Sequence, residues 1–401
     1  MTAYFQSWFQ MPGHAQGISV RALSRLLIAT ALMAQACAGT KHTNSGSVGT
    51  DIEPIAQPAG EQLSQWVDLT AVANRDTFPP AAEDATLIYD SAEKRVILFG
   101  GKNDADENLN QVWILDLNHY TWRRVVTQGA IPPSSEDHVC VYDPVNQQML
   151  LHGGEDGDTR NILWSLDLFT FEWHDLTSPI SPYLENHTAV YNSINKGMIL
   201  FGGETYGIHS NEIWSLDLDP ESVTFLKWMK LPSRGVAPKP RSDHVAVFDS
   251  LRNRMVIFGG WRKDDRMLLD DTWAYSFRRR KWRRIKTKKS HPPARRHAVG
   301  IYFPPRNWFI IHGGYGERGF LNDVWAFDLT YDVWINITPG PQPRIDHQAF
   351  YDPIRGQVII YGGDAKLARK FHDVWGLDIL PNWDVKSILR ATGSELRRPR
   401  R

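Results

Sequence analysis

Residues 346–375 read DHQAFYDPIRGQVIIYGGDAKLARKFHDVW, and this plan recurs along the chain. A segment that opens on Asp-His passes through an aromatic-Asp turn into an apolar run closed by two glycines, and a tryptophan follows about 11 residues later. A fixed period of roughly 50 residues indicates a repeat architecture. The six glycine pairs that mark the copies are Gly100-Gly101, Gly153-Gly154, Gly202-Gly203, Gly259-Gly260, Gly313-Gly314 and Gly362-Gly363.

Each repeat contains four short segments with the character of β-strands. The run before the glycines, such as Val96-Ile97-Leu98-Phe99, is too short for a helix and rich in β-branched and aromatic residues, which is typical of a buried strand. A third strand opens at Trp113, Trp164, Trp214, Trp273, Trp325 and Trp375. A fourth strand is marked by Trp122, Trp173, Trp228, Trp282, Trp334 and Trp383. Four-stranded antiparallel units repeated around an axis form the blades of a β-propeller.

This pattern resembles the kelch repeat, in which an Arg-x-x-His start precedes the glycine pair and an Asn and a Trp-x-x-Asp follow it. The residues that match include Arg241, His244, Gly259, Gly260, Asn322, Trp325, Asp328, Arg344, His347, Gly362 and Gly363. In the first repeat Ala85 stands where other repeats have the histidine. The resemblance implies an all-β, six-bladed kelch-type propeller over residues 63–385, with seven blades as the alternative. It implies less about function, because one fold hosts many activities.

The ends of the repeat region predict how the ring closes. Trp66-Val67-Asp68-Leu69-Thr70 resembles Trp173-His174-Asp175-Leu176-Thr177, the fourth strand of the second repeat. We therefore expect this N-terminal strand to pair with the last repeat, which would leave Trp383 outside the sheet.

Composition restricts the class of protein. The 401 residues include 45 Lys and Arg and 45 Asp and Glu, so the net charge of zero gives no basis for expecting a nucleic-acid partner. A content of 42% hydrophobic and 22% charged residues is globular and excludes a disordered or polytopic membrane chain. Sixteen tryptophans are expected to pack between blades rather than to bind ligands.

The N-terminus predicts export. Arg21 and Arg25 precede a short apolar run, 26–34, and Ala34-Gln35-Ala36 provides a cleavage site, so residues 1–36 are interpreted as a signal peptide. Cys37 follows at once, which resembles a bacterial lipoprotein and predicts lipidation and attachment to the cell envelope. Simple export to the periplasm or medium is the alternative. Residues 37–62 are interpreted as a flexible tether, and 386–401 as a basic disordered tail.

Candidate binding residues lie where loops between strands meet. In kelch modules that bind acidic peptides, arginines near the starts of the inner strands contact carboxylates, and by this resemblance Arg241, Arg295 and Arg344 are the leading candidates. A salt bridge to an aspartate of a neighbouring blade is the alternative role. The loops after the glycine pairs add Arg262, Arg318 and Glu204.

Three metal-like patterns do not predict a cofactor. Five histidines share one repeat position, but one per blade is too dispersed for a single coordination sphere; they are His138, His187, His244, His297 and His347. Asp104, Asp106 and Asn108 begin like a calcium loop, but Leu109 occupies the position of the required glycine. Cys140 lies in an apolar strand and is interpreted as an inert small hydrophobe, which argues against copper chemistry with a Cys–Tyr cross-link.

The most uneven charge is a basic run over 278–289, around a hairpin between a third and a fourth strand. It predicts either a solvated edge that resists aggregation or contact with anionic lipid heads or acidic glycans.

Together these features predict a monomeric, non-catalytic binding module of the cell envelope that grips a protein or glycan with its loops. The alternative is a carbohydrate-active, epimerase- or lyase-like enzyme, in which Glu204, Glu317 or His209 would supply acid–base groups.

Overall fold

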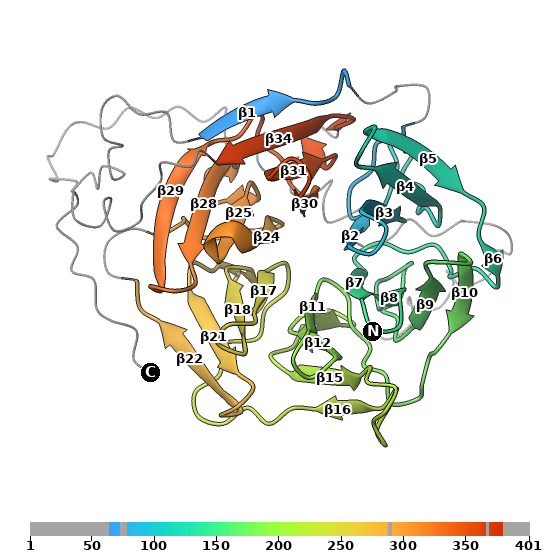
Figure 1. The fold of residues 1–401 in the computed structure, drawn as a ribbon. Coiled ribbons are helices and arrows are strands. Elements are labelled where there is room, and N and C mark those ends of the chain that lie inside the picture. Colours follow the sequence, from blue (N-terminus) through green and yellow to red (C-terminus); the bar gives the residue numbers. More distant parts are fainter. Residues whose placement is uncertain (1–63, 73–77, 288–290, 366–368, 380–401) are drawn as a thin grey trace, which may run out of the picture. The chain divides into compact units, whose positions relative to one another are not determined.

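The computed structural model describes residues 64–72, 78–287, 291–365 and 369–379, all of which belong to one compact unit, 53–401. The predicted signal peptide, the predicted tether, the predicted tail and Trp383 lie outside the described residues. The described residues form six antiparallel sheets with four principal strands each, arranged around an axis (Figure 1). None of the helices in this part of the chain has the length and apolar character needed to cross a bilayer.

The sheets follow the chain in order. The first three contain β2 (Thr86–Asp90), β3 (Arg95–Phe99), β4 (Val112–Asp116) and β5 (Thr121–Val125); β7 (Val139–Asp143), β8 (Gln148–His152), β9 (Leu163–Asp167) and β10 (Glu172–Asp175); and β11 (Thr188–Asn192), β12 (Gly197–Phe201), β15 (Ile213–Asp217) and β16 (Trp228–Lys230). The next three contain β17 (Val245–Asp249), β18 (Arg254–Phe258), β21 (Thr272–Ser276) and β22 (Lys281–Ile285); β24 (Val299–Phe303), β25 (Trp308–His312), β28 (Asp323–Asp328) and β29 (Val333–Pro339); and β30 (Gln348–Asp352), β31 (Gln357–Tyr361), β34 (Val374–Ile379) and β1 (Ser64–Asp68).

The chain also forms short strands and one 3-10 turn outside the four principal strands of each sheet. β6 (Gln128–Gly129) adds a fifth strand to the second sheet, and a 3-10 turn (Pro304–Arg306) follows β24. The remaining short strands are β13 (Glu204–Thr205), β14 (Ile208–His209), β19 (Trp261–Arg262), β20 (Met267–Leu268), β23 (Arg295–Arg296), β26 (Tyr315–Gly316), β27 (Gly319–Phe320), β32 (Asp364–Ala365) and β33 (Arg369–Lys370).

The first strand of each repeat is innermost, and the six inner strands close a ring. β2, β7, β11, β17, β24 and β30 each neighbour the next, and β30 neighbours β2 (Figure 1). β1 pairs antiparallel with β34, with Trp66 opposite Leu377. This pairing of an N-terminal strand with the last repeat confirms the closure predicted from the sequence, and the fold is the all-β propeller expected.

The glycine pairs are required by backbone conformation and by space. Gly100 and Gly101 have φ of +68° and +89°, in the region that residues with a side chain rarely adopt. A Cβ on Gly101 would also lie 2.7 Å from the carbonyl oxygen of Glu83. The second sheet repeats the arrangement, since Gly154 has φ +92° and would place a Cβ 2.7 Å from the carbonyl oxygen of Glu136.

The core lies between the blades, and tryptophans join each blade to the one before it. Trp173, Trp282 and Trp334 pack on Phe99, Phe201 and Phe258, with ring centroids 4.6–5.1 Å apart. The other three contacts are Trp122 with Tyr361, Trp228 with His152 and Trp66 with His312. For these six tryptophans the predicted packing between blades is confirmed. Trp66, rather than Trp383, is the fourth-strand tryptophan of the last sheet.

Candidate functional site

The end of the sheets that carries the glycine pairs, here called the glycine face, brings together loops from all six blades. In each blade a residue before the inner strand bridges to the residue that follows the glycine pair. The bridges are Glu83 to Lys102, Glu136 to Glu155, Glu185 to Glu204, Ser242 to Trp261, Arg296 to Tyr315 and Ile345 to Asp364. Polar, charged and aromatic side chains are therefore held in register at the innermost end of every blade.

Beside these bridges runs a ring of six equivalent residues, here called the axial ring: Asp84, Asp137, Asn186, Asp243, His297 and Asp346. All six have φ between +50° and +60°, which Asp, Asn and His adopt more readily than other non-glycine residues. Five of them donate a backbone N–H to the carbonyl oxygen of the ring member in the preceding blade, over 3.0–3.3 Å. The axial ring thus ties the blades together at the centre of the glycine face.

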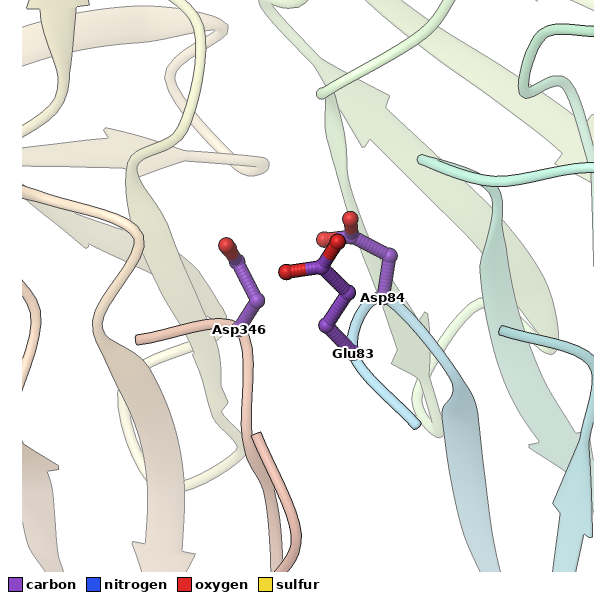
Figure 2. Close-up of side chains that lie close together, drawn as sticks. All are labelled: Glu83, Asp84 and Asp346. Atoms are coloured by element: carbon purple, nitrogen blue, oxygen red, sulfur yellow. The ribbon is translucent and has the colours of Figure 1, made fainter. Parts of the chain in front are cut away.

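Carboxylates dominate one part of the axial ring. Figure 2 shows Glu83, Asp84 and Asp346, each of which contributes one carboxylate oxygen to a group of three that lie within 4.8 Å of one another. Such oxygen ligands suit Ca²⁺ or Mg²⁺, so these are the described residues that could hold a cation. Lys370 Nζ lies 3.6 Å from a Glu83 oxygen, and His297 Nδ1 lies 2.7 Å from an Asp346 oxygen. Cationic side chains of the protein therefore already offset much of this negative charge.

His297 is held between two carboxylates of the axial ring. Its Nδ1 lies 2.7 Å from Asp346 and 3.8 Å from Asp243. Burial opposes protonation of the imidazole, but the charges of Asp243 and Asp346 and the hydrogen bond with Asp346 outweigh it, so the pKa of His297 is raised. A positive imidazolium here stabilises the acidic ring.

The placement of His297 corrects the prediction that five histidines share one repeat position. Only four do so among the described residues, packed against the second glycine of the pair: His138, His187, His244 and His347. In the fifth repeat Ala298 occupies that position, and His297 lies one residue earlier, in the axial ring. The fifth repeat reads Arg-Arg-His-Ala, so matching its histidine to the others shifts the register by one residue.

The four aligned histidines are buried and neutral. Burial lowers the pKa of His138 to about 4 and of His244 to about 3. His187 Nε2 lies 3.0 Å from His152 Nδ1, and His347 Nε2 lies 2.8 Å from His312 Nδ1. His187, His244 and His347 therefore make hydrogen bonds to other side chains inside the protein, with His244 Nε2 lying 2.8 Å from Thr188 Oγ1.

The arginines predicted to bind a partner have a structural role instead. Arg241, Arg295 and Arg344 are at most 1% exposed. Each guanidinium forms a two-pronged ion pair, 2.6–3.2 Å long, with an aspartate of its own sheet: Asp271, Asp323 and Asp373, respectively. Each also donates to the carbonyl oxygen of the first glycine of the pair. The guanidinium donors are thus taken up within one blade and do not face a ligand.

The aspartate partners complete a repeated network. Asp271 accepts a hydrogen bond from the indole N–H of Trp273 at 2.7 Å, and Asp323 does the same for Trp325. Burial raises the pKa of these carboxyls, but hydrogen bonds and charge from the arginines outweigh it, so the pKa of Asp271 and of Asp323 is lowered.

The other predicted loop residues lie on the glycine face but do not form one site. Arg262 pairs with Asp265 at 3.2 Å, and Arg318 is exposed. Glu204 is buried, 3.6 Å from His209 Nε2 and 3.8 Å from Lys263 Nζ. His209 Nδ1 accepts the backbone N–H of Lys263 at 3.2 Å, which anchors the β13–β14 hairpin to the neighbouring loop, whereas Nε2 faces Glu204 of the same hairpin.

Sequence reasoning missed Arg296, which has the features expected of a binding residue. Its guanidinium carbon lies 5.0 Å from the ring centroid of Trp261, in a loop of the preceding blade, and 5.7 Å from that of Tyr315, in its own blade. Its Nε is buried without a hydrogen-bond partner, and no carboxylate among the described residues forms an ion pair with it. The two aromatic rings thus orient the guanidinium group, and its N–H groups can donate hydrogen bonds to another molecule.

Exposed apolar side chains lie on the same face. Tyr206 and Ile208, in the β13–β14 hairpin, are 65% and 74% exposed, and Tyr183 of the preceding loop is 45% exposed. The rings of Tyr183 and Tyr206 are 6.2 Å apart, and Thr205 Oγ1 donates to the carbonyl oxygen of Tyr183. Such aromatic residues are enriched at protein interfaces.

Two further predictions concern single residues. The loop that begins like a calcium site is ordered by Asn103, whose side-chain oxygen accepts the N–H groups of Ala105 and Glu107. Cys140 accepts a hydrogen bond from Thr86 Oγ1 at 2.9 Å, and burial raises the pKa of its thiol to about 12. This thiol is unreactive at neutral pH, in agreement with its interpretation as an inert residue.

Comparison with known proteins settles the family. The model of the KLHDC2/KLHL20/DRC7 kelch-repeats domain matches residues 63–183 and 145–340. The chain belongs to the kelch-repeat family. This confirms the resemblance found in the sequence, and kelch repeats typically mediate interactions between proteins.

Several relatives of this kelch protein are plant proteins. Adagio-like protein 1 of Oryza sativa subsp. japonica is 28% identical over 82% of the chain and 47% of its own length. Acyl-CoA-binding domain-containing protein 4 of Arabidopsis thaliana is 25% identical over 77% of the chain and 47% of its own length. An F-box/kelch-repeat protein of Arabidopsis thaliana is 28% identical over 45% of the chain and 39% of its own length. The chain spans less than half the length of these relatives, and they do not bear on its predicted export.

Proposed function

We propose that this kelch propeller is a non-catalytic module that binds a partner protein on its glycine face. Two observations support the proposal: membership of a family of interaction modules, and exposed Tyr183, Tyr206 and Ile208 on the face where the loops of all blades meet. The propeller acts as a rigid frame, so the loops lose little conformational entropy when they bind.

Arg296 carries the proposal. Its side chain is half-buried between Trp261 and Tyr315, and its charge has no counter-ion among the described residues. A guanidinium that is partly desolvated and already oriented binds a carboxylate more strongly than a mobile surface arginine does. Arg296 is therefore the contact for an acidic group of the partner, the role that the sequence assigned to its neighbour Arg295.

The rest of the glycine face restricts the partner further. Glu136, at the bridge of the second blade, already pairs with Lys102 Nζ at 3.2 Å, so it is not available to a partner. The best-matched partner segment carries an acidic group near Arg296 and apolar side chains beside Tyr206.

The test compares Arg296→Ala, Arg296→Lys and the control Arg318→Ala, an exposed arginine on the adjacent β26–β27 turn. Each protein is used as bait in an extract of the source organism, and bound proteins are quantified by mass spectrometry. A partner retained by the parent and by Arg318→Ala but lost by Arg296→Ala, with partial loss for Arg296→Lys, supports the proposal. Equal capture by all four folded proteins contradicts the assignment of Arg296.

We also propose, from the sequence alone, that the protein is exported and anchored at the cell envelope through Cys37. The basic flank, short apolar run and Ala-Gln-Ala site support the proposal. Mass spectrometry of the mature protein tests it: an N-terminus at an acylated Cys37 is expected, and a chain that retains residues 1–36 would contradict it.

A further inference from the structure

The outermost strand of the fourth blade carries the most concentrated charge among the described residues. Seven exposed cations lie within nine residues, on β22, in the turn before it and directly after it: Arg278, Arg279, Arg280, Lys281, Arg283, Arg284 and Lys286. Trp282 and Ile285 of the same strand are buried in the blade, so the strand itself is firmly seated while its charged side chains face solvent. β22 lies on the outer wall of the propeller (Figure 1), away from the innermost strands.

Little negative charge opposes these cations. The ion pair between Arg283 and Asp332, 2.8 Å long, is the only one that a side chain of this run makes with a described residue. Asp332 is shared, since it also pairs with Arg252 at 3.1 Å and with Arg254 at 2.9 Å. Arg234 of the preceding loop adds another exposed cation, because its backbone bridges to Lys281. The wall therefore has a large positive excess in a chain whose net charge is zero.

The other outer strands differ from β22. β29, the outer strand of the next blade, reads VWINITP and has no charged residue, and β10 reads EWHD. β5 reads TWRRV, the nearest in sequence, but its Arg123 lies over the ring of Phe171. A basic edge is therefore not a general requirement of this propeller, which argues against a role that is only structural.

β22 is also an open edge. It is the terminal strand of its sheet, and beyond β21 its pairing with described residues is limited to the bridge at Lys281. An edge strand offers backbone N–H and C=O groups to another extended chain. Neither a membrane surface nor a glycan uses a row of backbone donors and acceptors, whereas a peptide does.

We propose that β22 and its turn form a second binding surface, which accepts an extended Asp/Glu-rich segment of a partner protein as an added strand. Backbone pairing along Trp282–Ile285 aligns the segment, and its carboxylates meet the flanking arginines and lysines. This surface is separate from Arg296 and does not depend on the function proposed for the glycine face.

The test uses fluorescence anisotropy with the labelled peptide (Glu-Thr)6 and the full chain. The variant Arg278→Ser/Arg284→Ser/Lys286→Ser removes three cations of the surface, and the control variant Arg124→Ser/Lys227→Ser/Arg318→Ser removes three exposed cations elsewhere. The same net charge is lost in both. We expect the peptide to bind the parent, the first variant to bind about tenfold more weakly, and the control to stay within about twofold. Equal weakening in both variants would overturn the proposal, because it would show non-specific attraction.

A second peptide tests strand addition. The same sequence with N-methyl groups on alternate residues keeps every charge but cannot pair along one backbone edge, and we expect it to bind the parent about tenfold more weakly. Equal affinity overturns the added strand. Heparin and phosphatidylserine–phosphatidylcholine vesicles serve as competing probes. If either binds through the β22 cations while the peptide does not, or if no probe binds, the proposal is wrong. Arg296→Ala should leave peptide binding unchanged, which separates this test from that of the glycine face.

Discussion

Mild acid should unfold this propeller, because six buried histidines must stay neutral in the folded state. They are His138, His152, His187, His244, His312 and His347. Burial lowers the pKa of all six, to about 4 for His138 and about 3 for His152, His244 and His312. An unfolded histidine titrates near pH 6.5. The unfolded chain therefore binds more protons below that pH, and stability must fall as the pH falls.

The size of the effect follows from these shifts. Each histidine reduces the free energy of unfolding by about 1.4 kcal/mol per pH unit between its unfolded and folded pKa. At pH 5 one such histidine costs about 2 kcal/mol and six independent ones cost about 12 kcal/mol. That sum is comparable to the whole stability of a typical domain, about 5–15 kcal/mol. His297 acts in the opposite direction, since its raised pKa gives stability that is present below pH 6.5 and lost as the pH rises through the folded pKa.

The assay is urea unfolding followed by tryptophan fluorescence at pH 7.5, 6.5, 5.5 and 5.0. The lowered pKa of Asp271 and of Asp323 confines the stability lost on their protonation to below about pH 4. Burial raises the pKa of Asp328, which therefore acts in the direction opposite to the six histidines, because the folded protein takes up this proton more readily than the unfolded chain as the pH falls. His138→Ala is the matched variant, since Ala85 and Ala298 hold the same repeat position in two blades. It should be less stable at pH 7.5 but lose about 1.4 kcal/mol less per pH unit.

A free energy of unfolding that changes by less than about 2 kcal/mol between pH 6.5 and 5.0 would refute this reasoning. It would mean that the imidazoles are hydrated or already charged in the folded protein. An unchanged slope in His138→Ala, with a normal slope in the parent, would show that the acid response comes from other groups.

Four further predictions concern stability and reactivity. Arg344→Ala should cost about 3–5 kcal/mol in urea unfolding because it leaves Asp373 beside the blade interior without its ion pair, whereas Arg318→Ala should be neutral. Gly101→Ala should lower the free energy of unfolding by more than about 1 kcal/mol, since its φ is +89° and its Cβ would meet the Glu83 carbonyl; an unchanged midpoint would contradict the account of the glycine pairs. Trp66→Ala should cost about 3–5 kcal/mol by opening the closure between the first and last strands, measured by thermal unfolding against Val67→Ala. Cys140 should react with a thiol reagent at pH 8 only after denaturation, because burial raises its pKa to about 12, and rapid labelling of the native protein would contradict this.

The fold was predictable because every level of the sequence agrees. Glycine pairs, strand runs and tryptophans recur with one period, and Trp66-Val67-Asp68 copies a fourth strand closely enough to predict the closure with β34. Such consistency between local pattern and global architecture is what specifies a single structure.

The site was only partly predictable, because its chemistry depends on register within single repeats. Arg295 and Arg296 are adjacent, and burial assigns the first to Asp323 and leaves the second between Trp261 and Tyr315. One signal was present in the sequence. The repeats that have the arginine also have an aspartate two residues before their tryptophan, Asp271, Asp323 and Asp373, whereas Gln111, Ile162 and Glu212 stand there in the repeats without it.

The axial ring could not be read from the sequence by the same means. Its members are Asp, Asn or His, and what they share is a backbone conformation and hydrogen bonds across blades. Both properties arise only when the ring closes, and the shortened start of the fifth repeat hides the equivalence of His297 with Asp243 and Asp346.

Site-specific photo-crosslinking tests the central claim, binding at the glycine face, most directly. A benzophenone amino acid replaces either Tyr206 on the glycine face or Ile194 on the opposite turn face, positions that are 65% and 50% exposed. We expect the captured partner to crosslink from position 206 and not from 194. Crosslinking from 194 alone, or equally from both positions, would contradict it.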